Sequence, residues 1–236
     1  WIDEKFSLGC TMEDVTSTTG LIAFQGPGTA EAIDKLADTP LSGMRPFSWA
    51  ETAIQGAPML VGRTGYTGED GFEMLVQGNH VVNIWTALTA SGAVPCGLGA
   101  RDVLRLEAAL PLHGHEIDEE TTPIEAGLDR FVRFDKEYVG SDVLRDQQEN
   151  GVKRKLVGFT LPGRSAPRAE YNLLHQGEIV GAVTSGSYSP TLDTSIGMGY
   201  VLERYAEPGA TLDLDIRGRA AQVTVTVLPF YSRPRR

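Results

Sequence analysis

Cysteine is scarce in this sequence, and the segments that mark secretion or membrane insertion are missing. Its 236 residues include two cysteines, Cys10 and Cys96, which lie far apart and outside any CxxC pair. No disulfide framework is indicated, so we expect two small buried thiols in a reducing, cytoplasmic setting. No apolar run approaches the roughly 18 residues of a membrane helix, and the first residues lack a signal-peptide pattern. We therefore predict no membrane partner.

Signatures of common catalytic sites are absent as well. The sequence has no GxSxG, P-loop or complete dinucleotide-binding motif, and no serine, cysteine or lysine has a convincing catalytic base beside it. The segment HGHEIDEE, residues 113–120, has two histidines but no third histidine nearby and no HExxH. We interpret it as a solvated acidic loop and predict no metal site. Catalytic residues stay unknown at this level.

Positive charge is scarce in the first 150 residues. The formal net charge of the chain is −10, which does not favour nucleic-acid binding. Residues 1–150 contain 10 basic and 24 acidic side chains, whereas residues 151–236 contain 11 basic and 7 acidic ones. The step indicates two parts with different partners or a mutual interface, or only an acidic surface that keeps one part soluble. With the change of sequence texture near Gly151, it predicts domains 1–150 and 151–236.

The first domain has the pattern of an α+β fold. Apolar runs and helical spacings follow one another in the order β-α-β-β-β-α-α, which predicts helices packed on an antiparallel sheet. In the helix predicted at 79–92, the apolar side consists of Val82, Ile84, Trp85 and Leu88. The predicted strands are 20–26 and three within 45–77, with turns at 55–56 and 65–71, and the other predicted helices are 27–38 and 98–110.

Three further helical segments are predicted in this domain. The opening residues 1–20 start with Trp1 instead of methionine and read as a helix already under way, so we expect the chain to begin inside a larger polypeptide. Thr122, Pro123 and Glu125 have the spacing of a capping box with proline at the first helical position. Residues 137–151 predict a short helix that closes the domain.

From Lys153 onward the pattern becomes all-β. Five short apolar segments are separated by Gly, Pro, Asn and Asp at even spacing, which predicts a small C-terminal β-barrel or sandwich. These segments are 153–161, 177–186, 195–202, 210–216 and 219–230.

The segment RTGYTGEDGFEMLV, residues 63–76, combines a glycine-rich turn with an alternating strand. Glycine permits φ > 0 and close approach of the backbone to a ligand. Period-2 alternation fixes Glu73 within the strand, whereas Glu69 and Asp70 lie at the tip of the turn. A carboxylate fixed in this way can accept a paired donor fork, from an arginine or from the 2-amino/N3–H edge of a pterin. The alternative is an exposed strand residue or a salt bridge to the next strand.

Arg101 and Arg105 lie four residues apart in the helix predicted at 98–110. Like charges at this spacing repel mildly, and a cation in the first turn opposes the helix dipole. Arg101 therefore needs a specific partner, such as an anion or a protein carboxylate between the two arginines. The alternative is a surface pair with Asp102 and Glu107.

Three long segments in order resemble the aminomethyltransferase, or T-protein, family of the glycine cleavage system over essentially the whole chain. They are RTGYTGEDGFEMLV, CGLGARDVLRLEAALPLHGHEIDEETTPIEAGL and VTSGSYSPTLDTSIGMGYV. The resemblance implies a cloverleaf of three parts around a central folate site, with a small C-terminal barrel. It also implies an enzyme that transfers the methylene of an aminomethyl group on the lipoyl arm of H-protein to tetrahydrofolate, with release of ammonia.

The resemblance also implies which residues bind the folate. Glu73 is expected to clamp the pterin edge, and Tyr66 to stack on the ligand or hydrogen-bond to it. Arg101 is expected to contact the folate or its glutamyl carboxylates. Arg233 belongs to a terminal segment that returns to the central site in the family. One departure is Arg130, which replaces a tryptophan found in many members and puts one aromatic wall of the pocket in doubt.

The second departure is that the chain begins about one third of the way into the family pattern. The acidic residue that assists chemistry at folate N5 belongs to the part before this point. We therefore expect the 236-residue chain by itself to bind folate weakly or not at all.

Two alternative functions use a related fold. One is the folate-binding domain of a sarcosine or dimethylglycine dehydrogenase, which an upstream flavin domain would identify. The other is a non-enzymatic folate-binding relative that serves iron–sulfur assembly and carries a KGCYxGQE-like segment. This chain reads FDKEYVGSDVL there, without a cysteine, which argues against the second alternative.

Overall fold

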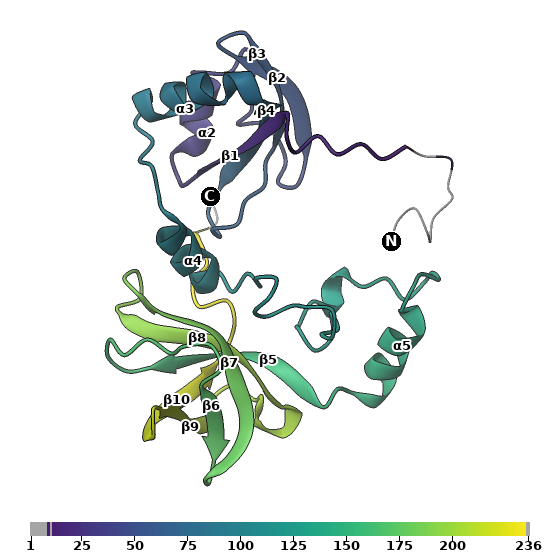
Figure 1. The fold of residues 1–236 in the computed structure, drawn as a ribbon, viewed down its shortest axis with the longest axis vertical. Helices are drawn as coiled ribbons and strands as arrows, with labels where there is room; N and C mark the ends of the chain where they lie inside the picture. The colour runs from purple at the N-terminus through teal and green to yellow at the C-terminus, as the bar shows by residue number, and fades with distance from the viewer. Residues whose placement is uncertain (1–8, 10, 235–236) are drawn as a thin grey trace. The chain divides into compact units, whose positions relative to one another are not determined.

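The computed structural model describes residue 9 and residues 11–234. These residues form two compact units (Figure 1). The first unit consists of the residues up to 65 together with 69–95, and the second of residues 66–68 together with those from 96 onward. The tip of the glycine-rich turn therefore belongs to the second unit, while the strand that follows it belongs to the first.

The first unit is a four-stranded antiparallel sheet with helices on one face, as the sequence predicts. The strand order is β1-β4-β3-β2, so β4 is central and carries β1 on one side and β3 on the other. The strands are β1 (Thr19–Gln25), β2 (Trp49–Ile54), β3 (Ala57–Gly62) and β4 (Gly71–Gln77), and the helices are α2 (Thr29–Asp34), the short η1 (Gly78–His80) and α3 (Val81–Ala90).

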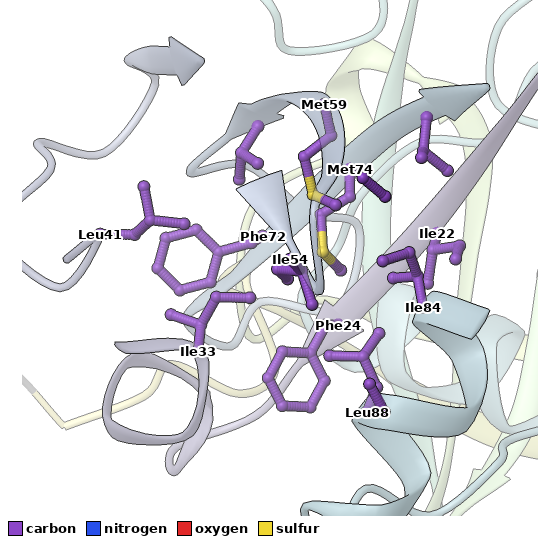
Figure 2. Close-up of a cluster of buried hydrophobic side chains, with 14 residues drawn as sticks. Ile22, Phe24, Ile33, Leu41, Ile54, Met59, Phe72, Met74, Ile84 and Leu88 are labelled. Carbon is purple, nitrogen blue, oxygen red and sulfur yellow. The ribbon is translucent and has the colours of Figure 1, made fainter. Parts of the chain in front are cut away.

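Alternation along the strands builds the core of this unit. In β4, Phe72, Met74 and Val76 are buried, whereas Glu73 and Leu75 are only half-buried. Figure 2 shows the resulting cluster, in which side chains of the sheet meet those of α2 and α3. The cluster contains Ile22, Phe24, Ile33, Leu41, Ile54, Ala57, Met59, Val61, Phe72, Met74, Val76, Ile84, Ala87 and Leu88.

The predicted apolar side of α3 is half wrong. Ile84 and Leu88 are buried with Ala87, but Val82 is 72% exposed and Trp85 is 47% exposed. Residues 84, 87 and 88 follow the i, i+3, i+4 spacing of one helix face, whereas residues 82 and 85 lie on the neighbouring face. The apolar face is thus rotated away from the tryptophan, because small Ala87 packs against the sheet.

The helix predicted at 1–20 is not found in the described residues. Residues 11–15 have no regular structure, residues 16–18 form a turn, and β1 starts at Thr19. Thr18 and Thr19 donate their hydroxyl groups to the carbonyl of Val15, which favours a turn over a helix. Residues 1–8 and Cys10 lie outside the described residues. Cys96 is exposed, so the expectation of a buried thiol is wrong at that position.

The second unit contains a closed six-stranded barrel, which confirms the predicted C-terminal fold. The strand order is β10-β5-β8-β7-β6-β9, and β10 also pairs with β9 to close the barrel. The strands are β5 (Arg154–Leu161), β6 (Asn172–His175), β7 (Glu178–Ser189), β8 (Thr194–Leu202), β9 (Thr211–Ile216) and β10 (Arg219–Thr226). Sequence reasoning missed β6, whose four residues are too few for a periodic signal.

Helices precede the barrel within the same unit. They are α4 (Leu98–Glu107), the short η2 (Asp129–Phe131) and α5 (Ser141–Asn150), while η3 (Glu203–Tyr205) follows β8. The side chains of Thr122 and Glu125 bond each other's backbone N–H at 3.2 and 3.0 Å, as a capping box does. The chain then makes a turn through residues 123–127 and no α-helix. None of the described helices is long and apolar enough to cross a membrane.

A separate buried cluster fixes α4 against the barrel. Leu106 of α4 packs with Ile196 and Met198 of β8, and Leu228 and Phe230 from the segment after β10 cover the same cluster. The N–H of Tyr231 donates to the carbonyl of Glu107 at 2.8 Å. The last part of the chain therefore returns to the end of α4. By compactness, residues 96–150 group with the barrel. The domain boundary predicted near Gly151 stays a prediction.

Candidate functional site

The structure brings two of the predicted binding residues together, Tyr66 and Arg101. The guanidinium carbon of Arg101 lies 4.8 Å from the centre of the Tyr66 ring, within the range of a cation–π contact. The Tyr66 hydroxyl donates to the carbonyl of Pro111 at 2.6 Å. Burial raises the pKa of this hydroxyl, although the nearby charge of Arg105 acts in the opposite direction. Tyr66 therefore presents a neutral ring that is fixed at both its face and its hydroxyl.

Gly68 explains why the turn beside Tyr66 is rich in glycine. Its φ is +75°, a conformation that side chains rarely adopt, and a Cβ at this position would lie 2.6 Å from the Cβ of Ala108. The turn can approach the end of α4 only because residue 68 has no side chain. The close approach that the sequence predicts for a ligand is thus made, at this glycine, to the protein itself.

Arg101 and Arg105 have different environments despite their spacing. Arg101 is exposed in the first turn of α4, whereas Arg105 is buried with 1% of its side chain exposed. Arg105 donates from Nε to Asp102 and from Nη1 to Glu116, both at 2.7 Å. Protein carboxylates therefore compensate Arg105. Of the two residues in the alternative surface pair, Asp102 is a partner of Arg105, whereas the Glu107 carboxylate accepts from Ser189. The guanidinium of Arg101 lies over the ring of Tyr66 instead.

Glu116 is the candidate residue whose burial differs most from the prediction. The segment 113–120 is predicted to be a solvated acidic loop, yet Glu116 is fully buried. Its carboxylate faces Arg105, and its backbone carbonyl accepts the hydroxyl of Tyr200 at 2.7 Å. Asp118, Glu119 and Glu120 are exposed, as expected. Within the part of the chain that the structure describes, no group of three His, Cys, Asp or Glu side chains is placed to hold a metal ion.

Two serines of β7 hydrogen-bond to the buried charged side chains of α4. Ser185 accepts from Nη2 of Arg105 at 2.7 Å, and Ser189 donates to Oε1 of Glu107 at 2.6 Å. Both serines and Glu107 are buried. No local pattern distinguishes these serines from ordinary strand residues, because their partners lie about 80 residues earlier in the sequence.

Glu73 occupies the position that alternation predicts, in the central strand of the first unit. It lies opposite Ala23 of β1 and Gly62 of β3. Its Oε2 accepts the hydroxyl of Thr64 at 2.5 Å, and the side chain is half-buried on the face away from the core. The carboxylate is thus oriented by one neutral hydroxyl, and its other oxygen can accept a further donor.

The remaining predicted positions lie in the second unit. Arg233 is half-buried in the segment after β10, three residues beyond Phe230, which packs near α4. The guanidinium of Arg130 lies 4.7 Å from the centre of the Phe131 ring, which is itself exposed. An aromatic side chain is therefore adjacent to the position where many members of the resembled family have tryptophan.

Comparison with known proteins adds independent support for the resemblance. Residues 1–136 match the family described as the GCVT N-terminal domain, and residues 154–232 match the glycine cleavage T-protein C-terminal barrel domain. An aminomethyltransferase from Synechococcus elongatus is 43% identical over 233 residues, which cover 98% of this chain and 63% of that protein. One from Geobacillus thermodenitrificans is 42% identical, covering 99% of this chain and 66% of that protein.

A solved structure shares the fold. The chain resembles glycine cleavage system aminomethyltransferase T from Bartonella henselae with a TM-score of 0.84 and 32% identity, covering 90% of this chain and 60% of that one. The chain spans less than two thirds of the length of these relatives, at 63% and 60%. Both family matches and the relatives agree over nearly all of its residues, and the chain therefore belongs to the glycine cleavage T-protein family.

Proposed function

We propose that this chain carries the folate-binding part of an aminomethyltransferase of the glycine cleavage system. In this reaction tetrahydrofolate receives the methylene of an aminomethyl group borne by the lipoyl arm of H-protein, and ammonia is released. Tetrahydrofolate is the substrate and H-protein the partner. The expected cytoplasmic setting stays a prediction.

The observation that carries the proposal is the pairing of Arg101 with Tyr66. Arg101 is an exposed cation held over an aromatic ring at 4.8 Å, in the helix turn where the dipole disfavours positive charge. An anionic ligand would relieve that cost. Folate joins flat aromatic rings to glutamyl carboxylates, so it offers both a surface for the Tyr66 ring and an anion for Arg101.

Glu73 supports the same ligand class. Its carboxylate accepts one hydrogen bond from Thr64 and stands on a central strand, where the backbone cannot shift without breaking pairs on both sides. A pterin presents two adjacent donors, the 2-amino group and N3–H, which suit one carboxylate in a paired geometry. We propose that Glu73 receives these donors.

The alternative functions receive less support. The relatives named above are aminomethyltransferases, and none of them is a sarcosine or dimethylglycine dehydrogenase or an iron–sulfur assembly protein. We therefore keep the aminomethyltransferase as the proposal.

A chimera tests the proposal directly. The chain would replace the matching 233 residues of the Synechococcus elongatus relative. Ammonia release and 5,10-methylenetetrahydrofolate formation would be measured with aminomethylated H-protein and tetrahydrofolate, beside an Arg101→Ala chimera. We expect turnover by the first and a large loss in the second. A chimera that folds, as judged by its melting curve, but gives no product would contradict the proposed function.

A further inference from the structure

We propose that Glu116 is a positioning residue, which holds the backbone on both sides of Pro111 and thereby fixes the carbonyl that receives the Tyr66 hydroxyl. The ligand contacts of Tyr66 rest on the proposed function, but the positioning itself rests on the geometry alone.

The first step is that hydrogen bonds of Glu116 fix the backbone of residues 110–112. Its Oε2 accepts the N–H of Leu112 at 2.9 Å and Nη1 of Arg105 at 2.7 Å. The same Nη1 donates to the carbonyl of Leu110 at 3.2 Å. One carboxylate oxygen therefore fixes residue 112 directly and residue 110 through Arg105. Pro111 lies between the two fixed residues and has no N–H of its own to bond.

The second step leads from Pro111 to the candidate site. The carbonyl of Pro111 accepts the Tyr66 hydroxyl at 2.6 Å, and the Tyr66 ring supports Arg101. A shift of this carbonyl would release the hydroxyl of Tyr66. The ring would then lose the orientation in which Arg101 lies over its face.

The third step explains why Glu116 itself does not move. Its Oε1 accepts the hydroxyl of Thr184 in β7 at 2.6 Å, and its backbone carbonyl accepts the hydroxyl of Tyr200 in β8 at 2.7 Å. The residue is fully buried, so water does not compete for these bonds. The barrel thus serves as the fixed base, and Glu116 transmits its position to the loop that holds Tyr66.

Three variants separate positioning from a purely structural role. Glu116→Ala removes the hydrogen bonds that fix residues 110–112, but it leaves Arg105 as a buried cation without its fully buried partner. The double variant Arg105→Met with Glu116→Ala removes these hydrogen bonds together with that charge. Glu116→Gln keeps an acceptor of the same length for Leu112, so it is the conservative rescue. Glu119→Gln is the matched control, because it removes the same charge from an exposed position in the same loop.

Fluorine NMR of the chain labelled with 3-fluorotyrosine gives the readout. The Tyr66 resonance is identified by its loss in Tyr66→Phe, and the resonances of Tyr171 and Tyr205, which pack on the barrel core, report the fold. We expect the Tyr66 resonance to move to the position of a solvent-exposed fluorotyrosine in the double variant. It should keep its wild-type position in Glu116→Gln and Glu119→Gln.

Two results would overturn the positioning role. One is a Tyr66 resonance at its wild-type position in the double variant. The other is loss of the Tyr171 and Tyr205 resonances in that variant, which would make the pair a determinant of the fold.

Titration of the same variants with tetrahydrofolate separates the two proposals, provided that each variant is built into the chimera with the Synechococcus elongatus relative, because the 236-residue chain by itself is expected to bind folate weakly or not at all. If no form binds while the Tyr66 resonance follows the expected pattern, the positioning stands and the proposed function fails. If the wild type binds and the double variant binds with the same affinity, the positioning role in ligand binding fails and the proposed function stands. If both are right, the double variant binds at least tenfold more weakly than Glu116→Gln.

Discussion

Arg63 and Asp70, which both belong to the first unit, form a two-bond ion pair at the two ends of the glycine-rich turn. Nε of Arg63 donates to Oδ1 of Asp70 at 3.0 Å, and Nη2 donates to Oδ2 at 2.6 Å. Both side chains are mostly buried. Nη1 of Arg63 also donates to the carbonyls of Ser42 and Met44. Asp70, which the sequence places at the tip of the turn, is thus part of the framework that orients β4 and Glu73.

Arg63→Lys is expected to lower the free energy of unfolding by about 1.5–3 kcal/mol, since an ammonium cannot reproduce the planar fork and the carbonyl contacts together. Chemical denaturation followed by tryptophan fluorescence measures the change. Lys35→Ala, which breaks an exposed pair with Glu31, is the control and is expected to change stability by less than about 1 kcal/mol. Equal losses in the two variants would contradict the framework role of Arg63.

Gly68→Ala is expected to destabilise the second unit by about 1–3 kcal/mol, because φ is positive and the new Cβ meets Ala108. Gly99→Ala, in the open first turn of α4, is the matched control. It is expected to be neutral or to stabilise the protein by up to about 1 kcal/mol. Thermal melts of both variants check the pair, and a stable Gly68→Ala protein would show that the turn does not need glycine at this position.

Glu73→Gln is expected to weaken tetrahydrofolate binding far more than Glu69→Gln, if the proposed function is right. Loss of the charge that faces a donor fork costs about 1.5–3 kcal/mol, or roughly tenfold or more in Kd. Glu69 at the turn tip should change affinity by less than about 0.5 kcal/mol. Calorimetric titration of the two chimeras measures this, and similar affinities would refute the role assigned to Glu73.

Arg101→Ala in the chimera is expected to raise the tetrahydrofolate Kd well over tenfold while the protein folds normally. Arg101 is exposed, so its contact with Tyr66 contributes only about 0.5–1 kcal/mol to stability. Arg101→Lys should recover little of the affinity, because an ammonium does not stack as a planar guanidinium does. Titrations beside melting curves decide the matter: wild-type affinity would exclude a ligand role, and a large drop in Tm would make the arginine structural.

Glu125 is expected to contribute stability that depends on pH. Burial raises the pKa of its carboxyl, but the Thr122 N–H and the Arg154 guanidinium outweigh burial, so the pKa lies below its ordinary value of 4.5. The stabilisation is therefore complete above about pH 4.5 and is lost as the pH falls through the folded-state pKa. Glu125→Gln should be less stable than the wild type at pH 7, and the difference should shrink below pH 4.5 in denaturant titrations. A constant difference across this range would contradict the assignment.

Local patterns predicted those features that depend on near neighbours. Alternation placed Glu73 on the open face of β4, and the capping-box spacing predicted the bonds between Thr122 and Glu125. The face of α3 was predicted less well, because the large ring of Trp85 was placed on the apolar side, while packing on the sheet selects the smaller Ala87.

The sequence pattern could not predict which charged side chains are buried. Glu116 stands beside three exposed acidic residues and differs from them because Arg105 meets its carboxylate from α4, while Thr184 and Tyr200 meet it from strands far along the chain. The side chains that meet Glu116 come from positions at least 11 residues away, so the local pattern does not reveal its burial. The pairing of Arg101 with Tyr66 was also not foreseen, because the two residues are joined by folding and each was assigned to the ligand separately.

The hydrogen bonds between α4 and β7 affect the order in which parts of the chain fold during its synthesis. Arg105 meets Ser185 at a separation of 80 residues, and Glu107 meets Ser189 at 82. Contacts of such high sequence separation form late, because the intervening chain must first be closed into a loop. When α4 leaves the ribosome, Arg105 already has Asp102 as a partner within the helix, but Arg105 and Glu107 lack their serine partners until β7 has followed. The sheet of the first unit is complete by Gln77, so it can form well before the turn around Tyr66 reaches its final geometry.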